Sequence, residues 1–302
     1  MKHTVLFLFI ILLISCGPRQ KNQESDHTET HLVTAVNYPL FYFAQKIGGD
    51  LISVEFPAPS DVDPAYWIPD DEALGIYQRS DLILANGADY ARWMHNVSLP
   101  SSRIFNTSSL VADRYFELTE AASHSHGPEG EHVHAGYAFT TWLDFQIAIA
   151  QSEAVKVALT SLLPGMQEQL EANWQALKSE LLELHAGMLE VSKQTEGKHL
   201  IGSHPVYQYL SKAYILDIRS VHFEPEELPS EDQWKEFDEL LADHPSNLML
   251  WEGEPLPEIR AVLQEKGIRV MVFNPCGNRP AEGDFMDVMK TNIQTLQRGL
   301  DD

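Results

Sequence analysis

The chain has 302 residues, of which 44 are acidic and 21 are basic, and its formal net charge is −23. A surface with this charge repels the phosphates of nucleic acids, which excludes nucleic acid as a partner, and it concentrates cations around the protein. The length suffices for two lobes or for one large domain.

The N-terminus has the pattern of a bacterial lipoprotein signal peptide over residues 1–15. Lys2 and His3 precede an apolar run at 5–14, which is shorter than the roughly 20 residues of a membrane-spanning helix. The run ends in Leu-Ile-Ser-Cys-Gly, so we expect cleavage before Cys16 and a lipid on that cysteine. The alternative is an ordinary secretory signal with a chance cysteine. We expect the mature chain outside the cytoplasm, anchored to a bacterial membrane by its lipid.

Residues 16–30 are predicted to be a flexible tether. From residue 17 to residue 30 there is no aliphatic or aromatic side chain, so this segment cannot bury apolar surface. Beyond Cys16 the only other cysteine is Cys276. An intramolecular disulfide is therefore not expected, and stability must come from a packed core.

Short apolar runs alternate with helical patterns along the rest of the chain, which is typical of α/β layering. The runs predicted as strands are 31–36, 51–56, 81–86, 200–203, 215–221, 247–251 and 269–273. Helical patterns occur at about 39–48, 70–79, 205–213, 231–243, 256–267 and 283–299. Both halves are therefore expected to be small parallel sheets covered by helices. Ligands of such sheets bind beyond the carboxyl ends of the strands.

A long amphipathic helix is predicted between the two halves. One apolar stripe, with spacings of three and four residues, is formed by Met166, Leu170, Trp174, Leu177, Leu181, Leu184, Met188 and Val191. Such a helix would extend about 40 Å at 1.5 Å per residue. A coiled-coil dimer is the competing interpretation, but a rigid rod packed across two lobes fits the flanking strands better. We expect an N-terminal lobe at 31–164, a linking helix at 165–195 and a C-terminal lobe at 196–302.

Four histidines are concentrated in a loop predicted over residues 123–137. They are His124, His126, His132 and His134, in two pairs of i, i+2 spacing, with Glu129 and Glu131 between them. Imidazoles and carboxylates in such loops bind zinc, copper or nickel. The alternative is a solvated loop without a ligand role. If the loop binds metal, it either delivers ions to a cleft or folds one histidine in beside another ligand.

A series of short motifs resembles the solute-binding lipoproteins of zinc and manganese ABC transporters, the ZnuA/TroA-like family. The motifs are VTAVNYPL at 33–40, IGGD at 47–50, DP at 63–64, SDLILANGA at 80–88, WLD at 142–144, GSHPVYQYL at 202–210, LWE at 250–252 and VFNP at 272–275. They follow the order of the family over nearly the whole mature chain. The resemblance implies a TroA-like periplasmic binding fold, with two α/β lobes joined by one long rigid helix. It also implies a metal in the cleft between the lobes and little motion on binding.

The resemblance also implies four ligand positions, and the chain departs from most of them. The histidine of the family's Asp-Pro-His triplet corresponds to Ala65, and the histidine before Trp-Leu-Asp corresponds to Thr140. The third histidine is matched by His204. The carboxylate after the last strand corresponds to Asn274, although some members use a glutamate near Glu252, which is present. Zinc needs three or four converging donors, so we expect the standard site to be degenerate.

Two functions remain open. The first is a monomeric solute-binding protein that captures a divalent transition metal, with zinc ahead of manganese, for the permease of an ABC importer. His204, Glu252 and the loop histidines are its candidate ligands, and Glu254 is a further carboxylate near the same strand end. The second is a paralogue that binds another ligand or a protein partner. An aromatic group at Tyr66, Trp67, Tyr137, Phe139 and Trp142 is compatible with that role.

An enzyme is not expected, because neither His-Glu-x-x-His nor Gly-x-Ser-x-Gly occurs in the sequence. The remaining histidines that we considered are expected on the surface or in packing roles, because they show no metal-ligand spacing. They are His95, His185, His222 and His244.

Overall fold

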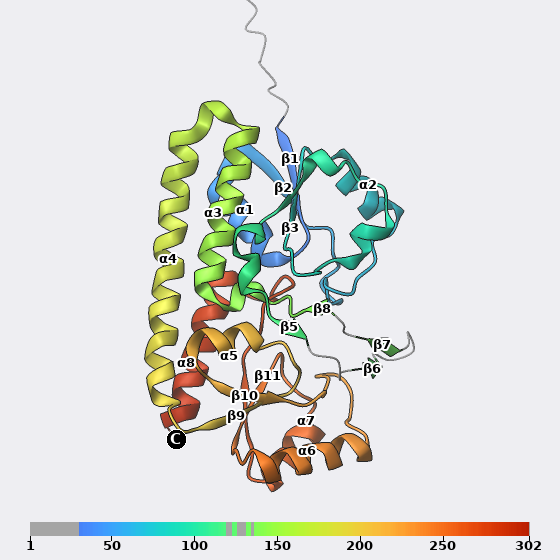
Figure 1. Ribbon diagram of the computed structural model, residues 1–302, viewed down its shortest axis with the longest axis vertical. Coiled ribbons are helices and arrows are strands. Elements are labelled where there is room, and N and C mark those ends of the chain that lie inside the picture. The colour runs from blue at the N-terminus through green and yellow to red at the C-terminus, as the bar shows by residue number, and fades with distance from the viewer. Residues whose placement is uncertain (1–29, 119–122, 126–130, 134–135, 302) are drawn as a thin grey trace, which may run out of the picture.

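The structure, a computed structural model, describes residues 30–118, 123–125, 131–133 and 136–301. It contains two α/β lobes, one above the other in Figure 1, with a long helix along one side of both. The predicted signal peptide, the predicted lipid-bearing Cys16 and residues 17–29 of the predicted tether lie outside the described residues. Within the described part, no helix has both the length and the apolar character needed to cross a bilayer.

The N-terminal lobe is built on a parallel sheet with the strand order β2-β1-β3-β4. The strands are β1 (His31–Ala35), β2 (Ile52–Glu55), β3 (Leu82–Ala85) and β4 (Ile104–Asn106). The first three correspond to predicted strands. The sequence pattern does not indicate β4, because its three residues include only two apolar side chains, which is too short a run to stand out as a strand.

Two helices of this lobe begin at side-chain caps that are visible in the sequence. α1 (Tyr38–Gly48) begins after Asn37, whose side chain accepts a hydrogen bond from the Leu40 backbone N–H. α2 (Asp71–Arg79) begins after Asp70 in the same way. Short 3-10 turns complete the lobe and its exit, at Gly49–Leu51, Arg92–Asn96, Ser101–Arg103, Ser109–Arg114, Thr141–Leu143 and Pro164–Met166.

The C-terminal lobe repeats this architecture, with a parallel sheet in the order β10-β9-β11-β12. Its strands are β9 (His199–Gly202), β10 (Asp217–Ser220), β11 (Leu248–Trp251) and β12 (Arg269–Val272). Its helices are α5 (Gln208–Tyr214), α6 (Glu231–Asp243), α7 (Pro257–Glu265) and α8 (Phe285–Asp301). Successive residues of a strand point to opposite faces of the sheet. Accordingly, Leu250 joins the main core while Met249 joins a second core under α6 and α7.

The long helix is α4 (Gln167–Gln194), and it is preceded by α3 (Phe145–Leu162). The predicted stripe is buried from Leu170 to Val191, whereas Met166 lies outside the helix and is exposed. Figure 1 shows α4 running past both lobes, with α3 and α1 beside its first half and α8 and α5 beside its second half. Helices of the same chain therefore cover the apolar stripe of α4, as the interpretation of α4 as a rod packed across two lobes requires. α3 is an element that the sequence analysis did not identify.

One continuous hydrophobic core runs through both lobes. It includes Val33 of the first sheet, Leu181 of α4 and Leu250 of the second sheet. α8 adds a second connection, because Phe285 at its start packs against the rings of Tyr42 and Phe43 in α1, at centroid distances of 5.7 and 5.6 Å. The lobes are thus joined by packed helices and not by a flexible linker alone.

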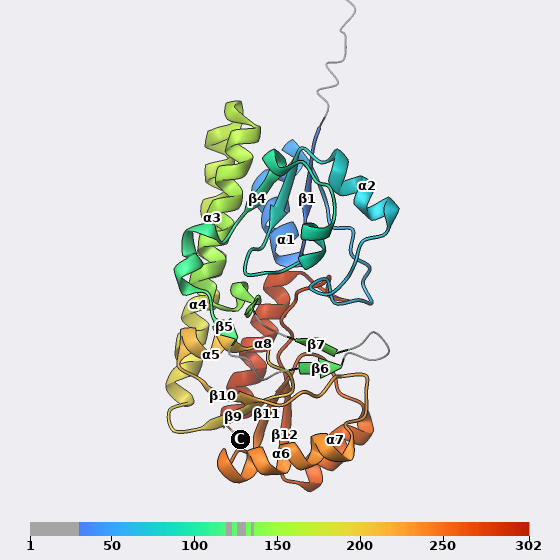
Figure 2. The same ribbon diagram turned by 45° about the vertical axis from the view of Figure 1, so that its right-hand side comes forward.

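The histidine-rich segment contains strands where a loop is expected. β5 (Glu117–Leu118) pairs with β8 (Gly136–Tyr137), and β6 (Ser123–Ser125) pairs with β7 (Glu131–Val133), both antiparallel. Figures 1 and 2 show β6 and β7 at the level of the gap between the lobes.

Candidate functional site

The loops that follow the strands of both sheets enclose a cavity between the lobes. Its volume is about 450 Å³, and it is lined by residues that follow β2, β10, β11 and β12 and by residues around Thr140. These are the carboxyl ends of parallel strands, where α/β sheets bind ligands. Among the described residues that line the cavity there is no lysine or arginine, whereas five carboxylates line it: Asp61, Asp63, Glu224, Glu226 and Glu252.

Ala65, Thr140 and Asn274, the positions that the resemblance implies as ligands but that lack imidazole or carboxylate, have structural roles. Ala65 is buried, has no donor atom in its side chain, and donates its backbone N–H to Asp63 Oδ1 at 2.8 Å. Thr140 donates its hydroxyl to the Val206 carbonyl at 2.6 Å. Asn274 Oδ1 accepts the Cys276 backbone N–H at 2.7 Å. The latter two polar side chains thus stabilise the loops around the cavity.

His204 lies in the loop after β9 and is buried, with 7% of its surface exposed. Its Nδ1 atom is 3.3 Å from Glu224 Oε1, and its ring meets the His222 ring edge to face, with a centroid distance of 5.6 Å. α5 begins only at Gln208, so His204 does not stand at a helix start, as the sequence suggests, but in the loop. Glu224 lines the cavity, so His204 lies directly behind a residue of the cavity wall.

Glu252 follows β11 and has a strongly perturbed carboxyl group. Burial, and then repulsion from Asp63, Glu224 and Glu226, raises its pKa from 4.5 to about 8. Asp63 belongs to the N-terminal lobe and the others belong to the C-terminal lobe, so the repulsion acts across the cavity. Glu254, two residues further on, is exposed and forms an ion pair with Arg260.

Aromatic side chains form another part of the cavity wall. Tyr90 packs edge to face against Phe139 and Trp142, with centroid distances of 5.3 and 5.9 Å. Trp142 is fully buried and donates its indole N–H to the Pro275 carbonyl at 2.7 Å, which links the two lobes. Cys276, a free and buried cysteine in the same wall, has its pKa raised to about 12 by burial. Its thiol therefore stays protonated at neutral pH.

The structure describes the predicted histidine loop only in part. His124 and His132 are directly opposite each other in the β6–β7 pair, whereas His126 and His134 lie outside the described residues. The predicted ligands His204 and Glu252 follow the neighbouring strands β9 and β11 of the same sheet. Glu252 lines the cavity, as does Val206, two residues after His204.

A different group of ligand-type residues lies elsewhere in the C-terminal lobe. Of the His, Cys, Asp and Glu residues that the structure describes, His199, Asp217 and His244 bring one ligand atom each within 4.8 Å of one another. His244, for which we predict a surface or packing role, is buried and stacks on His199 in this group. The prediction for His185 fits its contact with Tyr214, whose hydroxyl lies 3.0 Å from Nδ1.

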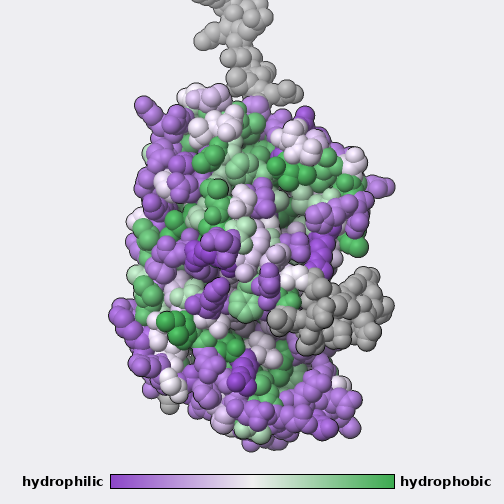
Figure 3. Space-filling view, viewed as in Figure 1, coloured by the Kyte–Doolittle hydropathy of each residue, from purple (hydrophilic) through white to green (hydrophobic). Residues whose placement is uncertain are grey.

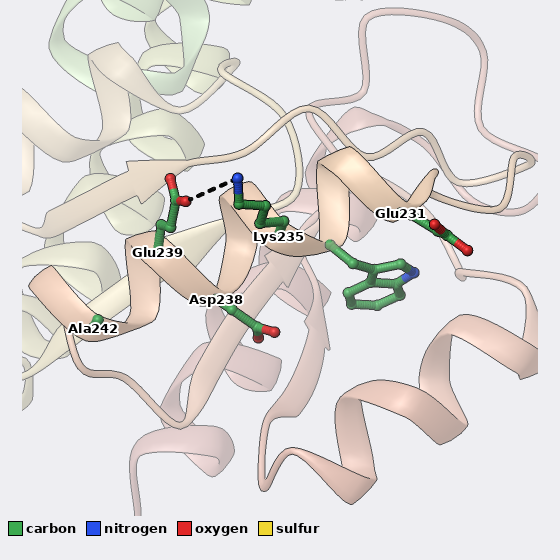
Figure 4. A pocket seen from close by; sticks show the side chains of 6 residues that line it. Glu231, Lys235, Asp238, Glu239 and Ala242 are labelled. Atoms are coloured by element: carbon green, nitrogen blue, oxygen red, sulfur yellow. Dashed lines mark ion pairs between the residues drawn. The ribbon is translucent and has the colours of Figure 1, made fainter.

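The outer face of α6 carries a shallow hollow with mixed charges, shown in Figure 4. Lys235 and Glu239 form an ion pair at 3.7 Å, and Asp238 pairs with Lys266 at 2.7 Å. Because Lys235, Asp238 and Glu239 already have partners of opposite charge, this hollow is an ordinary solvated face.

Two lobes, a long linking helix and a cavity between the carboxyl ends of two parallel sheets define a solute-binding protein. The family model described as "Zinc-uptake complex component A periplasmic" (ZnuA) matches residues 33–299, and the chain belongs to this family. The family is a metal-binding, solute-binding component of ABC transporters and not an enzyme family. The predicted resemblance is therefore confirmed. A comparison with curated proteins gives no match.

Solved structures confirm the predicted fold class. The metal-dependent lipoprotein YcdH from Bacillus subtilis is 21% identical, with a TM-score of 0.74, over 89% of this chain and 98% of its own. The Zn(II)-bound ZnuA-like domain of AdcA from Streptococcus pneumoniae is 19% identical, with a TM-score of 0.74, over 90% and 99%. The periplasmic zinc-binding protein TroA from Treponema pallidum is 19% identical, with a TM-score of 0.72, over 90% and 99%.

Proposed function

We propose that the chain is a lipid-anchored protein that captures zinc in the cavity between its lobes and delivers it to the permease of an ABC importer. The observation that supports this most strongly is the group of carboxylates that lines the cavity, and burial together with repulsion from Asp63, Glu224 and Glu226 raises the pKa of Glu252 to about 8. Carboxylates that are held close together repel one another, and this repulsion is unfavourable. A divalent cation among them would remove the repulsion, and the zinc-bound relatives make zinc the first candidate.

His204 and Glu252 are the proposed cavity ligands. The position of Glu224 beside His204 Nδ1 favours a proton on that atom, which leaves Nε2 to bind the metal and uses Glu224 to orient the ring. Zinc accepts imidazole nitrogen and carboxylate oxygen at about 2.0–2.2 Å. Manganese prefers carboxylates and carbonyls, so an imidazole ligand favours zinc.

The hairpin histidines supply the capture step in this proposal. His124 and His132 are Cα partners in the antiparallel β6–β7 pair, so two histidines lie opposite each other. Together with His126 and His134, which lie outside the described residues, they would collect ions from solution, and one of the four would complete the coordination of zinc in the cavity. Cys16 would carry the lipid that keeps the protein at the outer face of a bacterial membrane, close to the permease.

A monomer is proposed as the working form. On the face shown in Figure 3, hydrophobic areas are interrupted by hydrophilic residues. Stable association between copies normally buries a larger apolar area. The net charge of −23 would moreover oppose the approach of a second copy.

Equilibrium dialysis of the mature chain against zinc tests the proposal. The unchanged chain should bind zinc, and the double variant His204→Ala, Glu252→Gln should bind one equivalent fewer, because two ligands of the cavity site are lost. Glu254→Gln is the matched control, since this carboxylate is exposed and paired with Arg260, and it should bind like the unchanged chain. Absence of zinc binding by the unchanged chain would contradict the proposal.

One observation favours a second candidate function, the binding of an organic ligand by a paralogue with an altered site. The hydroxyl of Tyr90 is buried and has no hydrogen-bond partner among the described residues, and Tyr90 lines the cavity beside Phe139. A polar organic molecule could stack on this wall and bind the hydroxyl. Native mass spectrometry of the purified protein distinguishes the two functions, because a retained organic mass in place of zinc supports the second.

A further inference from the structure

We propose a second metal site, separate from the cavity, at the opposite edge of the C-terminal sheet. His199 begins β9 and Asp217 begins β10, and the two residues are Cα partners in the parallel pair. His244 ends α6 shortly before β11. The cavity lies beyond the carboxyl ends of these strands, whereas this group lies at their amino ends, so the two sites do not share residues.

The hydrogen bond of His244 determines which of its nitrogens is free. His244 is 1% exposed, and its Nε2 atom is 3.1 Å from the Leu200 carbonyl oxygen. A carbonyl can only accept, so Nε2 carries the proton and Nδ1 has the lone pair. This is the usual arrangement of a metal-binding histidine, in which a backbone carbonyl holds the second ring nitrogen and fixes the ring.

The neutral ring of His199 has one lone pair, on Nδ1 or on Nε2 according to the tautomer, and either nitrogen can bind a metal. Nε2 is 3.5 Å from Asp217 Oδ2, which is long for a charge-assisted hydrogen bond, and Nδ1 is buried without a hydrogen-bond partner among the described residues. The backbone around it is held in place, because Ser246 Oγ donates to the His199 carbonyl at 2.6 Å. A buried nitrogen that lacks a partner is unfavourable, and a bound cation would satisfy it.

The three residues need only a small rearrangement to bind one ion. Their ligand atoms lie within 4.8 Å of one another, whereas tetrahedral zinc with bonds of about 2.0–2.1 Å needs roughly 3.3 Å. The two imidazoles now stack, with a centroid distance of 4.3 Å and an angle of 8°, so their lone pairs lie in nearly parallel planes and do not meet at one point. His199 is 39% exposed and Asp217 is 57% exposed, so these two side chains can turn toward the fixed His244.

The local electrostatics favour a cation at this place. His244 is the C-cap of α6, where the unpaired carbonyls of the helix end carry a partial negative charge. Asp217 adds a full negative charge. Two imidazoles and one carboxylate suit borderline divalent metals such as zinc, copper and nickel. An ion here would tie β9, β10 and the end of α6 together and would stabilise the C-terminal lobe.

The experiment uses the full mature chain in a background that lacks the other proposed ligands. The background variant carries His204→Ala and Glu252→Gln, with the four hairpin histidines replaced by serine. We expect it to bind one equivalent of zinc or cobalt, and His199→Ala or Asp217→Asn to weaken that binding at least ~10-fold. His95→Ala, at an exposed histidine of the N-terminal lobe, is the matched control and should change nothing.

Imidazole NMR gives a readout that a merely structural role would not produce. Zinc should shift the ring resonances of His199 and His244 together, because coordination ends their stacking. If the background variant binds no metal, or if His199→Ala binds as well as the background, the second site does not exist. The result for this site is independent of whether the cavity binds zinc, because the cavity and hairpin ligands are absent throughout.

Discussion

Glu252, at the carboxyl end of β11, is the residue on which the proposed chemistry most depends. Its carboxyl group is crowded by Asp63 from the other lobe and by Glu224 and Glu226 from its own lobe. In the metal-free protein, Glu252 relieves this crowding by keeping its proton, because its pKa is raised to about 8. A metal ion would have to displace this proton, so zinc affinity should fall as the pH falls below 8.

The same carboxyl group should make the metal-free protein less stable as the pH rises. Between pH 4.5, its ordinary pKa, and pH 8, the folded chain keeps a proton that the unfolded chain releases, so the free energy of unfolding decreases with pH in this window. Glu252→Gln cannot ionise and removes this contribution. At pH 8 the variant should be more stable by roughly 1–3 kcal/mol, a value reduced for the partial exposure of the side chain.

Urea unfolding in the presence of a chelator, from pH 4.5 to pH 8, measures this difference. The curves of the two proteins should converge at the acidic end of the window and separate toward pH 8. Glu254→Gln, which changes an exposed carboxylate, should follow the unchanged chain. Parallel profiles for the Glu252→Gln variant and the unchanged chain would show that Glu252 titrates normally.

The sequence indicates some residues of the candidate site and cannot indicate others. His204 and Glu252 stand in short motifs, so a resemblance identifies them. Glu224 has no motif, and it meets His204 only because β10 lies next to β9 in the sheet. His199, Asp217 and His244 are likewise far apart in the sequence and are brought together by strand order.

At the scale of elements, α4 shows what an apolar stripe can predict. Its buried residues repeat with helical spacing, and the structure packs them against α1, α3, α5 and α8. α3 was missed because it is packed on several sides, and its buried residues therefore form no single stripe. Its N-cap was visible, since Asp144 accepts hydrogen bonds from the backbone N–H groups of Gln146 and Ile147.

Neighbouring leucines of α4 provide a test of this packing. Leu181 is fully buried, whereas Leu182 is 43% exposed. Leu181→Ala should lower the free energy of unfolding by about 2–5 kcal/mol, because it removes buried methyl groups and leaves a cavity. Leu182→Ala should lower it by less than about 1 kcal/mol. Equal effects in chemical denaturation would show that the stripe is not buried as described.

At the scale of the whole molecule, the two lobes share one core and two connecting helices. Residues of both sheets and of α4 belong to the same hydrophobic cluster, and Trp142 donates across to Pro275. Opening or closing the cavity by a hinge would have to break this packing. A cavity that hardly changes shape must therefore gain its affinity from the ligands that it already contains.

Small-angle scattering tests the expected rigidity. The scattering curves of the mature chain with a chelator and with saturating zinc should superimpose, because the shared core leaves little room for a domain rotation. A decrease in the radius of gyration that accompanies zinc binding would instead indicate closure of the lobes, and α4 would then have to bend.

Anomalous diffraction at the zinc absorption edge, from crystals of the mature chain grown with zinc, tests the central claim most directly. We expect a peak in the interlobe cavity, at about 2.0–2.2 Å from His204 Nε2 and from an oxygen of Glu252. Zinc found only at the hairpin or at His199 and His244, with an empty cavity, would contradict the account.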